Sequence, residues 1–83
     1  MYWVYVIYNP GAKKTYIGET EDIDSRLRLY NSKSFKGSYT SRINGEWELI
    51  YKESYPNRIV ARKREKQLKS YQGRQFLKKY IPV

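Results

Sequence analysis

Four side chains could together hydrolyse a phosphate ester in this 83-residue chain, which contains no histidine and no cysteine. Without histidine the usual general base is missing, so any catalysis must depend on hydroxyl, amino, guanidinium or carboxylate groups. Tyr5 and Tyr16 supply two hydroxyls. Arg26 can bind a phosphate oxygen and stabilise its growing charge, while Glu65 is a carboxylate that could bind a metal ion. Such a set predicts hydrolysis of a phosphodiester.

Glu65 lies in a strongly basic segment, on the apolar side of a predicted helix. Positions 61, 65 and 68 share one helical face, so Glu65 interrupts the stripe formed by Ala61 and Leu68, which Ile59 and Val60 extend one turn earlier. A lone acid there is either a salt-bridge partner or a metal ligand, and exposed salt bridges are the commoner case. Position alone leaves both interpretations open.

The other three candidates also have ordinary structural interpretations. Arg26 could pair with Asp22, four residues earlier on the same helix. Tyr5 and Tyr16 could be core aromatics, which is the default for any one of the ten tyrosines. The combination of two hydroxyls, a guanidinium and an isolated carboxylate is what favours catalysis.

The two tyrosines require a hairpin. Residues 2–8 (YWVYVIY) are apolar on both faces and predict a central strand, and residues 15–18 predict a shorter second strand after the turn sequence NPGAKK. If that turn closes symmetrically, Ile7 faces Tyr16. Because side chains alternate along a strand, Tyr5 and Tyr16 then share one face of the sheet.

A helix that begins near Thr20 would carry Arg26. Either Thr20 or Asp22 can cap the first turn. The apolar residues that recur at helical spacing are Ile23, Leu27 and Tyr30. Four acids surround this helix start, where the helix dipole favours them: Glu19, Glu21, Asp22 and Asp24. Neighbouring acids in one turn point in different directions, which disfavours a metal site there.

The remaining elements follow from turn residues and periodicity. Residues 31–44 are polar and predict a long loop. Residues 46–54 predict a third strand with Trp47, Leu49 and Tyr51 on one face. Pro56 and Asn57 then open a second helix that continues to about Lys69. A last helix over residues 72–80 directs three side chains inward: Phe76, Leu77 and Tyr80.

The charge distribution points to nucleic acid. The net charge is +9, with a sequence pI near 9.8. Residues 1–56 contain eight basic and seven acidic side chains, whereas residues 57–83 contain nine basic and one acidic. Basic domains with many aromatic residues most often bind phosphate backbones, although lysines and arginines can also serve solubility alone. No apolar run approaches the ~20 residues of a membrane span, so we expect a soluble, cytoplasmic protein, associated with the nucleoid when acting.

The residues resemble the GIY-YIG nuclease superfamily, and in particular its small stand-alone members. VYV at residues 4–6 is followed ten positions later by YIG at residues 16–18, which resembles the paired motif of the family. Arg26 in DIDSRLRLYN matches the family's arginine. Glu65 in ARKREKQLKS matches its glutamate. The resemblance covers essentially the whole chain. It implies one α+β domain over residues 1–83, a three-stranded, mainly antiparallel sheet flanked by three helices in the order β-β-α-β-α-α.

The resemblance also implies an activity and its residues. The protein would be an endonuclease that cuts DNA, with RNA a less favoured substrate, using one Mg²⁺ or Mn²⁺ ion bound by Glu65. Tyr5 would act as general base or position the nucleophile, Tyr16 would orient water or phosphate, and Arg26 would stabilise the phosphoryl charge. Further residues are expected to contact the nucleic acid: Gly18, Tyr30, Asn31, Lys33, Lys36, Arg42, Lys63, Arg64, Lys66, Lys69 and Arg74.

The chain departs from the family pattern in three places. VYV replaces GIY but keeps the tyrosine; Tyr30 and Asn31 stand where many small members have histidine and asparagine; and residues 70–75 lack the catalytic asparagine of some members. A non-catalytic DNA- or RNA-binding module of the same fold is therefore the alternative, and a basic ribosome-associated protein is a third. A role in DNA repair or recombination and a protein partner are expectations, and the oligomeric state stays open.

Overall fold

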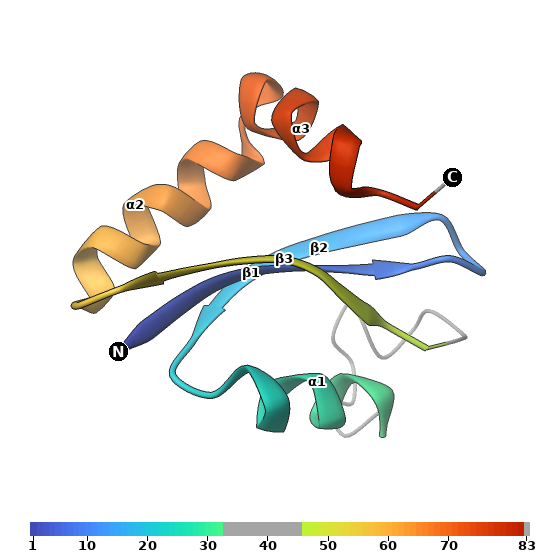
Figure 1. Ribbon diagram of the computed structural model, residues 1–83, viewed down its shortest axis with the longest axis horizontal. Helices are drawn as coiled ribbons and strands as arrows, with labels where there is room; N and C mark the ends of the chain where they lie inside the picture. The colour runs from blue at the N-terminus through green and yellow to red at the C-terminus, as the bar shows by residue number, and fades with distance from the viewer. Residues whose placement is uncertain (33–45, 83) are drawn as a thin grey trace.

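A three-stranded antiparallel sheet with helices on both faces forms the computed structural model, which describes residues 1–32 and 46–82. Helix α1 covers one face, and helices α2 and α3 cover the other (Figure 1). The elements are β1 (Tyr2–Asn9), β2 (Lys14–Thr20), α1 (Ile23–Asn31), β3 (Glu48–Tyr55), α2 (Arg58–Lys69), α3 (Tyr71–Leu77) and a short 3₁₀ turn, η2 (Lys78–Tyr80). The predicted α+β class and element order are confirmed.

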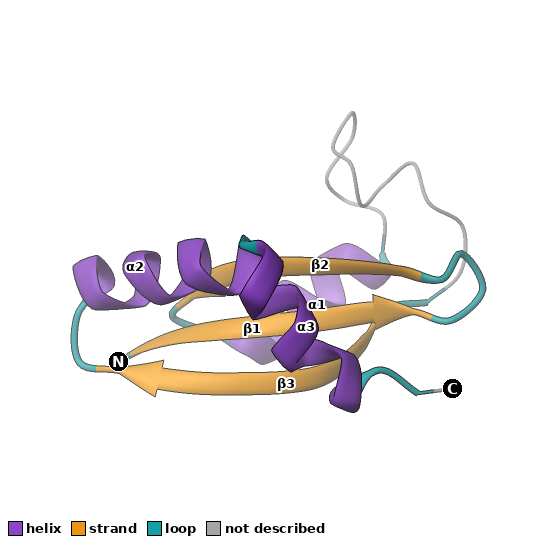
Figure 2. Cartoon of the chain, turned by 90° about the horizontal axis from the view of Figure 1, so that it is seen from above, coloured by secondary structure: helices purple, strands orange, loops and turns teal. Residues whose placement is uncertain are grey.

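Strand β1 is central, in the order β2-β1-β3, and is buried along most of its length (Figure 2). The predicted hairpin register is confirmed, because Ile7 pairs with Tyr16 across β1 and β2. Tyr5 pairs with Gly18, so Tyr5 and Tyr16 lie on the same face and are diagonal neighbours. Among the described strands, β2 lies at the edge of the sheet and pairs with β1 alone.

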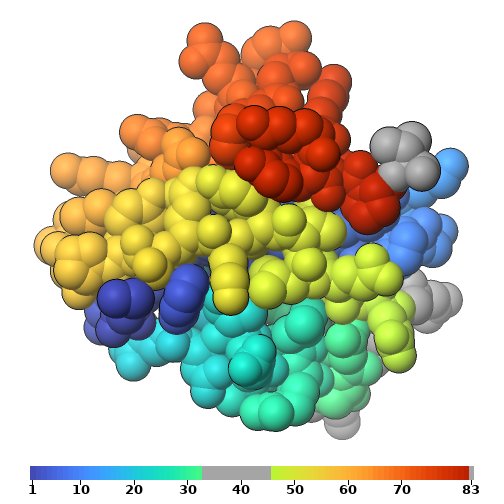
Figure 3. All heavy atoms as spheres, in the orientation of Figure 1, coloured from blue at the N-terminus to red at the C-terminus, as the bar shows by residue number. Residues whose placement is uncertain are grey.

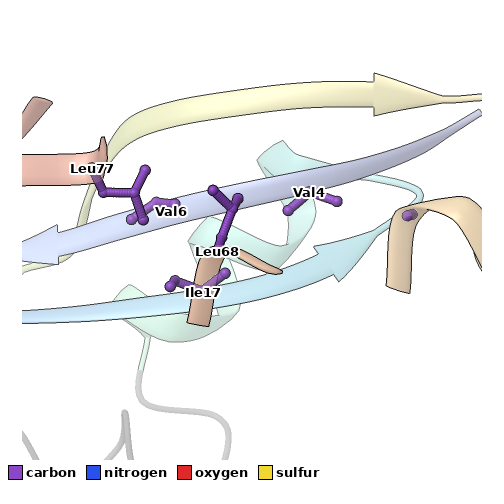
Figure 4. Close-up of a cluster of buried hydrophobic side chains, with 6 residues drawn as sticks. Val4, Val6, Ile17, Leu68 and Leu77 are labelled. Carbon is purple, nitrogen blue, oxygen red and sulfur yellow. The ribbon is translucent and has the colours of Figure 1, made fainter. Parts of the chain in front are cut away.

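The core between the sheet and helices α2 and α3 is aliphatic at its centre. Leu68 of α2 lies over the two strands of the hairpin, close to Val6 and Ile17 (Figure 4). The buried members of this cluster are Val4, Val6, Ile17, Ala61, Leu68 and Leu77. Truncation of a buried leucine lowers the free energy of unfolding by about 2–5 kcal/mol. The packing of Leu68 against the hairpin therefore holds α2 in position.

The opposite core, under α1, is aromatic. Ile23 and Tyr30 of α1 pack against Tyr5, Ile7 and Trp47. Helix α1 is capped as predicted, with the carboxylate of Asp22 accepting a hydrogen bond from the backbone N–H of Ser25 at 3.1 Å. The face of the sheet that carries Tyr5 is therefore covered by the helix that carries Arg26.

The prediction that Trp47, Leu49 and Tyr51 share one face of the third strand is wrong. Leu49 and Tyr51 oppose adjacent residues of β1, so one extra residue of β3, Ile50, lies between the two pairs. A bulge of this kind reverses the direction of every later side chain. Trp47 and Leu49 accordingly pack under α1, whereas Tyr51 packs on the face of α2 and α3.

Helix α2 starts as predicted, because the side chain of Asn57 accepts a hydrogen bond from the N–H of Val60 at 2.9 Å. Its inward stripe is shorter than predicted, however. Ile59 is 70% exposed and Val60 is 39% exposed, so only Ala61 and Leu68 are buried. The first turn of α2 lies at the end of the sheet, just after β3 ends at Tyr55 (Figure 1).

Helix α3 packs tightly on the end of α2 through Gly73, where an added Cβ would clash with the carbonyl oxygen of Gln67. Leu77 points inward as predicted, and Phe76 stacks edge-on against Tyr51, with ring centroids 5.6 Å apart. Tyr80 lies at the margin and is 37% exposed. Seen from the β3 side, β3 separates α3 from α1 (Figure 3).

Candidate functional site

A cleft of about 410 Å³ lies across the edge strand β2. Its lining residues come from β1, β2, α1 and α2: Tyr5, Tyr16, Gly18, Glu19, Arg26, Tyr30, Arg62 and Glu65. Because α1 and α2 cover opposite faces of the sheet, a cleft that both helices line must pass around the free edge of β2. All four side chains with predicted catalytic roles line this cleft.

Gly18 makes room for the phenol of Tyr5. A Cβ at Gly18 would lie 2.5 Å from the Tyr5 hydroxyl oxygen and 2.8 Å from Cζ, closer than real Cβ contacts. The Tyr5 ring therefore extends from the central strand across the backbone of β2 to reach the cleft. Gly18 also lines the cleft, and its expected contact with the nucleic acid stays a prediction.

The hydroxyls of Tyr5 and Tyr30 are 2.5 Å apart and share a hydrogen bond. Tyr16 packs edge-on against Tyr30, with ring centroids 5.6 Å apart, so three phenols from three elements meet beneath the cleft. Burial, followed by the hydrogen bond to Tyr30, raises the pKa of Tyr5 far above that of a free tyrosine. Burial also raises the pKa of Tyr30 to about 12. Both phenols are protonated at neutral pH.

Arg26 is the cation of α1 that lines the cleft. Its charge lowers the pKa of both Tyr5 and Tyr30, although by less than burial raises them, so it stands near these hydroxyls. Asp22, the alternative partner of Arg26, uses its carboxylate to accept hydrogen bonds from the N–H and hydroxyl of Ser25. Arg26 therefore lines the same space as the phenols of Tyr5, Tyr16 and Tyr30.

Glu65 enters the cleft from α2 and pairs with Lys69 one turn later, at 2.9 Å from Oε2 to Nζ. Its side chain is 23% exposed. The salt-bridge interpretation of Glu65 is therefore confirmed. Glu65 also lines the cleft, and its role as a metal ligand stays a prediction. An ion that enters the cleft can reach this carboxylate directly.

The GIY-YIG catalytic domain matches residues 1–80 of the chain. The chain belongs to the GIY-YIG family. UPF0213 proteins from two strains of Staphylococcus epidermidis are each 33% identical over 78 residues, which cover 93% of this chain and 90% of the relative. The solution structure of a UPF0213 protein from Bacillus halodurans has a TM-score of 0.53 and 26% identity, and covers 93% of this chain and 82% of that one.

Membership in the GIY-YIG family implies a nuclease-type hydrolase that acts on DNA and generally depends on a divalent metal. The cleft fits such an ion through its donor chemistry, because Glu65 and Glu19 both line it. Within residues 1–32 and 46–82, no three His, Cys, Asp or Glu side chains group together. Mg²⁺ needs only one or two carboxylates when substrate phosphates and waters complete its shell.

Sequence reasoning missed two residues of the GIY-YIG cleft, Glu19 and Arg62. Glu19 was grouped with the acids at the start of α1, but strand alternation places it with Ile17 on the side of α2, opposite to Gly18. Arg62 lies three residues before Glu65, on a neighbouring position of the same helical face. Both residues can be recognised as cleft residues only when β2 is known to be the edge strand that lies beneath α2.

Lys69 and Arg74 line a second hollow of about 230 Å³ that adjoins the cleft at Tyr16. The Arg74 side chain donates a hydrogen bond from Nε to the carbonyl of Lys69 at 3.1 Å. Lys63 and Lys66 are exposed on α2 and lie outside the cleft. Three other predicted phosphate contacts, Lys33, Lys36 and Arg42, lie outside the described residues.

Two residues predicted to contact nucleic acid also have structural roles. Arg64 donates from Nε and Nη2 to the two carboxylate oxygens of Glu53, at 2.8 and 3.0 Å, and so ties α2 to β3 away from the cleft. Asn31 donates to the carbonyl of Trp47 at 3.2 Å and accepts from its N–H at 2.7 Å. In both residues, polar atoms that could contact phosphate are hydrogen-bonded within the fold, and the nucleic-acid contacts stay predictions.

Proposed function

We propose that the protein is a metal-dependent endonuclease that hydrolyses DNA phosphodiester bonds in the cleft across β2. The observation that supports this proposal is the convergence of Tyr5, Tyr16, Arg26 and Glu65 on one cleft, from four separate elements. A purely structural set of tyrosines would need neither a cation nor a carboxylate beside it. The placement of all four around one open space is the arrangement that phosphoryl chemistry requires.

Arg26 binds the scissile phosphate and stabilises the charge that grows on its oxygens. Tyr5 positions the attacking water or the phosphate by hydrogen bonding. Of its two predicted roles, positioning is favoured over general base, because its raised pKa keeps the hydroxyl protonated before substrate binds. Tyr16 orients the same groups from the rim of the cleft.

Glu65 would hold the metal ion, one Mg²⁺ or Mn²⁺, after exchanging Lys69 for it. When bound, the ion acts as a Lewis acid on the phosphate and lowers the pKa of its own water. Lys69, once released from Glu65, faces the hollow it shares with Arg74 and binds a neighbouring phosphate there.

The DNA backbone follows the basic surface of α2 and α3. Phosphates adjoining the scissile one would lie against Arg62 in the cleft and against Lys69 and Arg74 in the second hollow. Backbone contacts carry little sequence information, so we expect structure preference or weak sequence specificity. This preference suits a role in DNA repair or recombination. No helix in the described residues is long and apolar enough to cross a membrane.

A nicking assay tests the proposal. Purified wild-type protein and Glu65→Gln are incubated with supercoiled and branched DNA in Mg²⁺, Mn²⁺ or EDTA. The expected result is metal-dependent cleavage that falls by at least about 100-fold in Glu65→Gln, a loss of the size seen when one charge-stabilising group is removed. DNA binding, measured by fluorescence anisotropy, should be retained.

Glu21→Gln is the matched control, because Glu21 is an exposed acid outside the cleft and its removal changes the net charge equally. It should cleave at the wild-type rate. Binding by wild-type protein without cleavage under any of these metal conditions would refute the endonuclease and leave the nucleic-acid-binding module.

A further inference from the structure

Glu19 is the acidic residue of β2 that lines the same cleft as Glu65. It is adjacent to Gly18, and its side chain leaves the strand toward α2, where Oε1 lies 3.4 Å from Nε of Arg58. The carboxylates of Glu19 and Glu65 thus approach one space from an edge strand and from the helix that crosses it. The cleft contains two carboxylates where the sequence motif provides one.

One carboxylate oxygen of Glu19 has no hydrogen-bond donor among the described residues. Oε2 is buried, and none of the described residues donates a hydrogen bond to it. The Glu19 side chain as a whole is only 14% exposed. A buried acceptor without a donor is destabilising, more so when it carries charge, and such groups need a reason to persist.

The ion pair with Arg58 does not supply that reason. Arg58 is 47% exposed and is also shared with Glu21, whose carboxylate lies 3.8 Å away. A long ion pair with one half-exposed partner contributes little to stability, and less than an unsatisfied buried acceptor costs. Anchoring α2 to β2 would be achieved as well by a residue without a second, orphaned oxygen.

We propose that Glu19 is a second carboxylate donor of the divalent-cation site, acting together with Glu65. The inference rests on the proposed function, since it concerns the ion of that same cleft. Two carboxylates match the charge of one divalent ion, and Mg²⁺ sites commonly use one or two of them beside substrate phosphates. A cation in the cleft would also give Oε2 of Glu19 an interaction partner, which the described residues do not supply.

Direct metal binding tests this role without reference to catalysis. Mn²⁺ alone is titrated into the full-length protein, and free Mn²⁺ is measured by electron paramagnetic resonance. We compare the wild type with Glu19→Gln and Glu65→Gln, and use Glu21→Gln as control, because Glu21 contacts the same Arg58 but lies outside the cleft. The expected result is at least about tenfold weaker Mn²⁺ binding in each cleft variant, within the range seen when a group that supports a metal is removed. The control should bind Mn²⁺ within twofold of the wild type.

Thermal unfolding of each variant separates metal effects from folding. Glu19→Gln removes a buried charge and should melt within a few degrees of the wild type. Wild-type Mn²⁺ affinity in a folded Glu19→Gln, beside loss of binding in Glu65→Gln, would overturn this inference and leave the proposed function intact. Absence of Mn²⁺ binding to the wild type at millimolar concentration would overturn both.

Discussion

Replacing Gly18 with alanine should displace Tyr5, although no unusual backbone angle at Gly18 is involved. The added Cβ would lie 2.5 Å from the Tyr5 hydroxyl oxygen and 2.8 Å from Cζ. Tyr5 is 2% exposed and sits on the central strand, so its ring has little room to retreat. The methyl group must therefore push the hydroxyl away from Tyr30 and break their shared hydrogen bond.

The change in the free energy of unfolding is the sum of two destabilising effects and one stabilising effect. Overpacking a core costs about 1–3 kcal/mol, and the lost hydrogen bond adds about 0.5–1.5 kcal/mol. Replacement of glycine reduces the entropy of the unfolded chain and returns about 0.4–1 kcal/mol. The free energy of unfolding of Gly18→Ala should fall by about 2 kcal/mol, which is a drop of about 2 M in the urea midpoint for a small domain.

Urea titration followed by tryptophan fluorescence and far-UV circular dichroism measures this change. Gly11→Ala is the control, because a Cβ there would meet only the side chain of Asn9, at an ordinary 3.5 Å, and the expected change is within 0.5 kcal/mol. A double-mutant cycle sharpens the test. Tyr5→Phe alone should cost about 1 kcal/mol. In the double mutant Gly18→Ala/Tyr5→Phe the new Cβ no longer meets a hydroxyl oxygen, and the hydrogen bond to Tyr30 is lost only once. The two changes in the free energy of unfolding should therefore couple by about 1 kcal/mol. A Gly18→Ala protein as stable as Gly11→Ala, or strictly additive single mutants, would refute the reasoning.

Further outcomes follow from buried polar groups. Burial raises the pKa of Glu53, but hydrogen bonds from Arg64 and two tyrosines outweigh it and leave the pKa below its usual 4.5; stability should therefore be lost as pH falls below about 4.5, and Glu53→Gln should flatten this dependence in acid-unfolding curves. Arg64→Met leaves a half-buried carboxylate and should lower the free energy of unfolding by about 1–3 kcal/mol without loss of cleavage by the folded fraction. The pKa values of Tyr5 and Tyr30 are raised above 10.0, so the stability they contribute is complete below pH 10 and lost toward pH 12; absorbance at 295 nm should show both phenols ionising only as the protein unfolds. Asn31→Ala removes two hydrogen bonds at the entry to β3 and should cost about 2 kcal/mol by urea titration. Simple titration of all tyrosines in the folded state, or full stability of Arg64→Met or Asn31→Ala, would contradict these expectations.

Local rules were enough to predict the hairpin and the helix starts. The six residues between Tyr8 and Thr15 fix the register, and the caps at Asp22 and Asn57 mark where α1 and α2 begin. Each of these features depends on residues within a few positions of one another. The same short range explains why strand alternation alone places Tyr5 and Tyr16 on one face of the sheet.

The bulge at Ile50 could not be predicted in this way. The alternation of Trp47, Leu49 and Tyr51 is regular, and only the competition of two different cores for β3 reveals the extra residue. Arg64 presents the same difficulty, because its partner Glu53 is eleven positions away on another element. A basic residue in a basic helix gives no local sign that it is bound within the fold.

The placement of the cleft explains why its two carboxylates differ so much in how visible they are in the sequence. Glu65 stands out because it breaks an apolar stripe, whereas Glu19 is hidden among acids that surround the start of α1. In the structure the strand ends only after Thr20, so Glu19 belongs to β2 and not to the helix start. A cleft that passes around an edge strand can be lined by residues from both faces of that strand. Here Gly18 faces the side of α1, and Glu19 faces the side of α2. Two consecutive residues of one strand can therefore serve a single site, Gly18 by admitting the phenol of Tyr5 and Glu19 by supplying charge. The edge position of β2 in the described sheet is thus what lets three strands bring residues from both faces to one cleft.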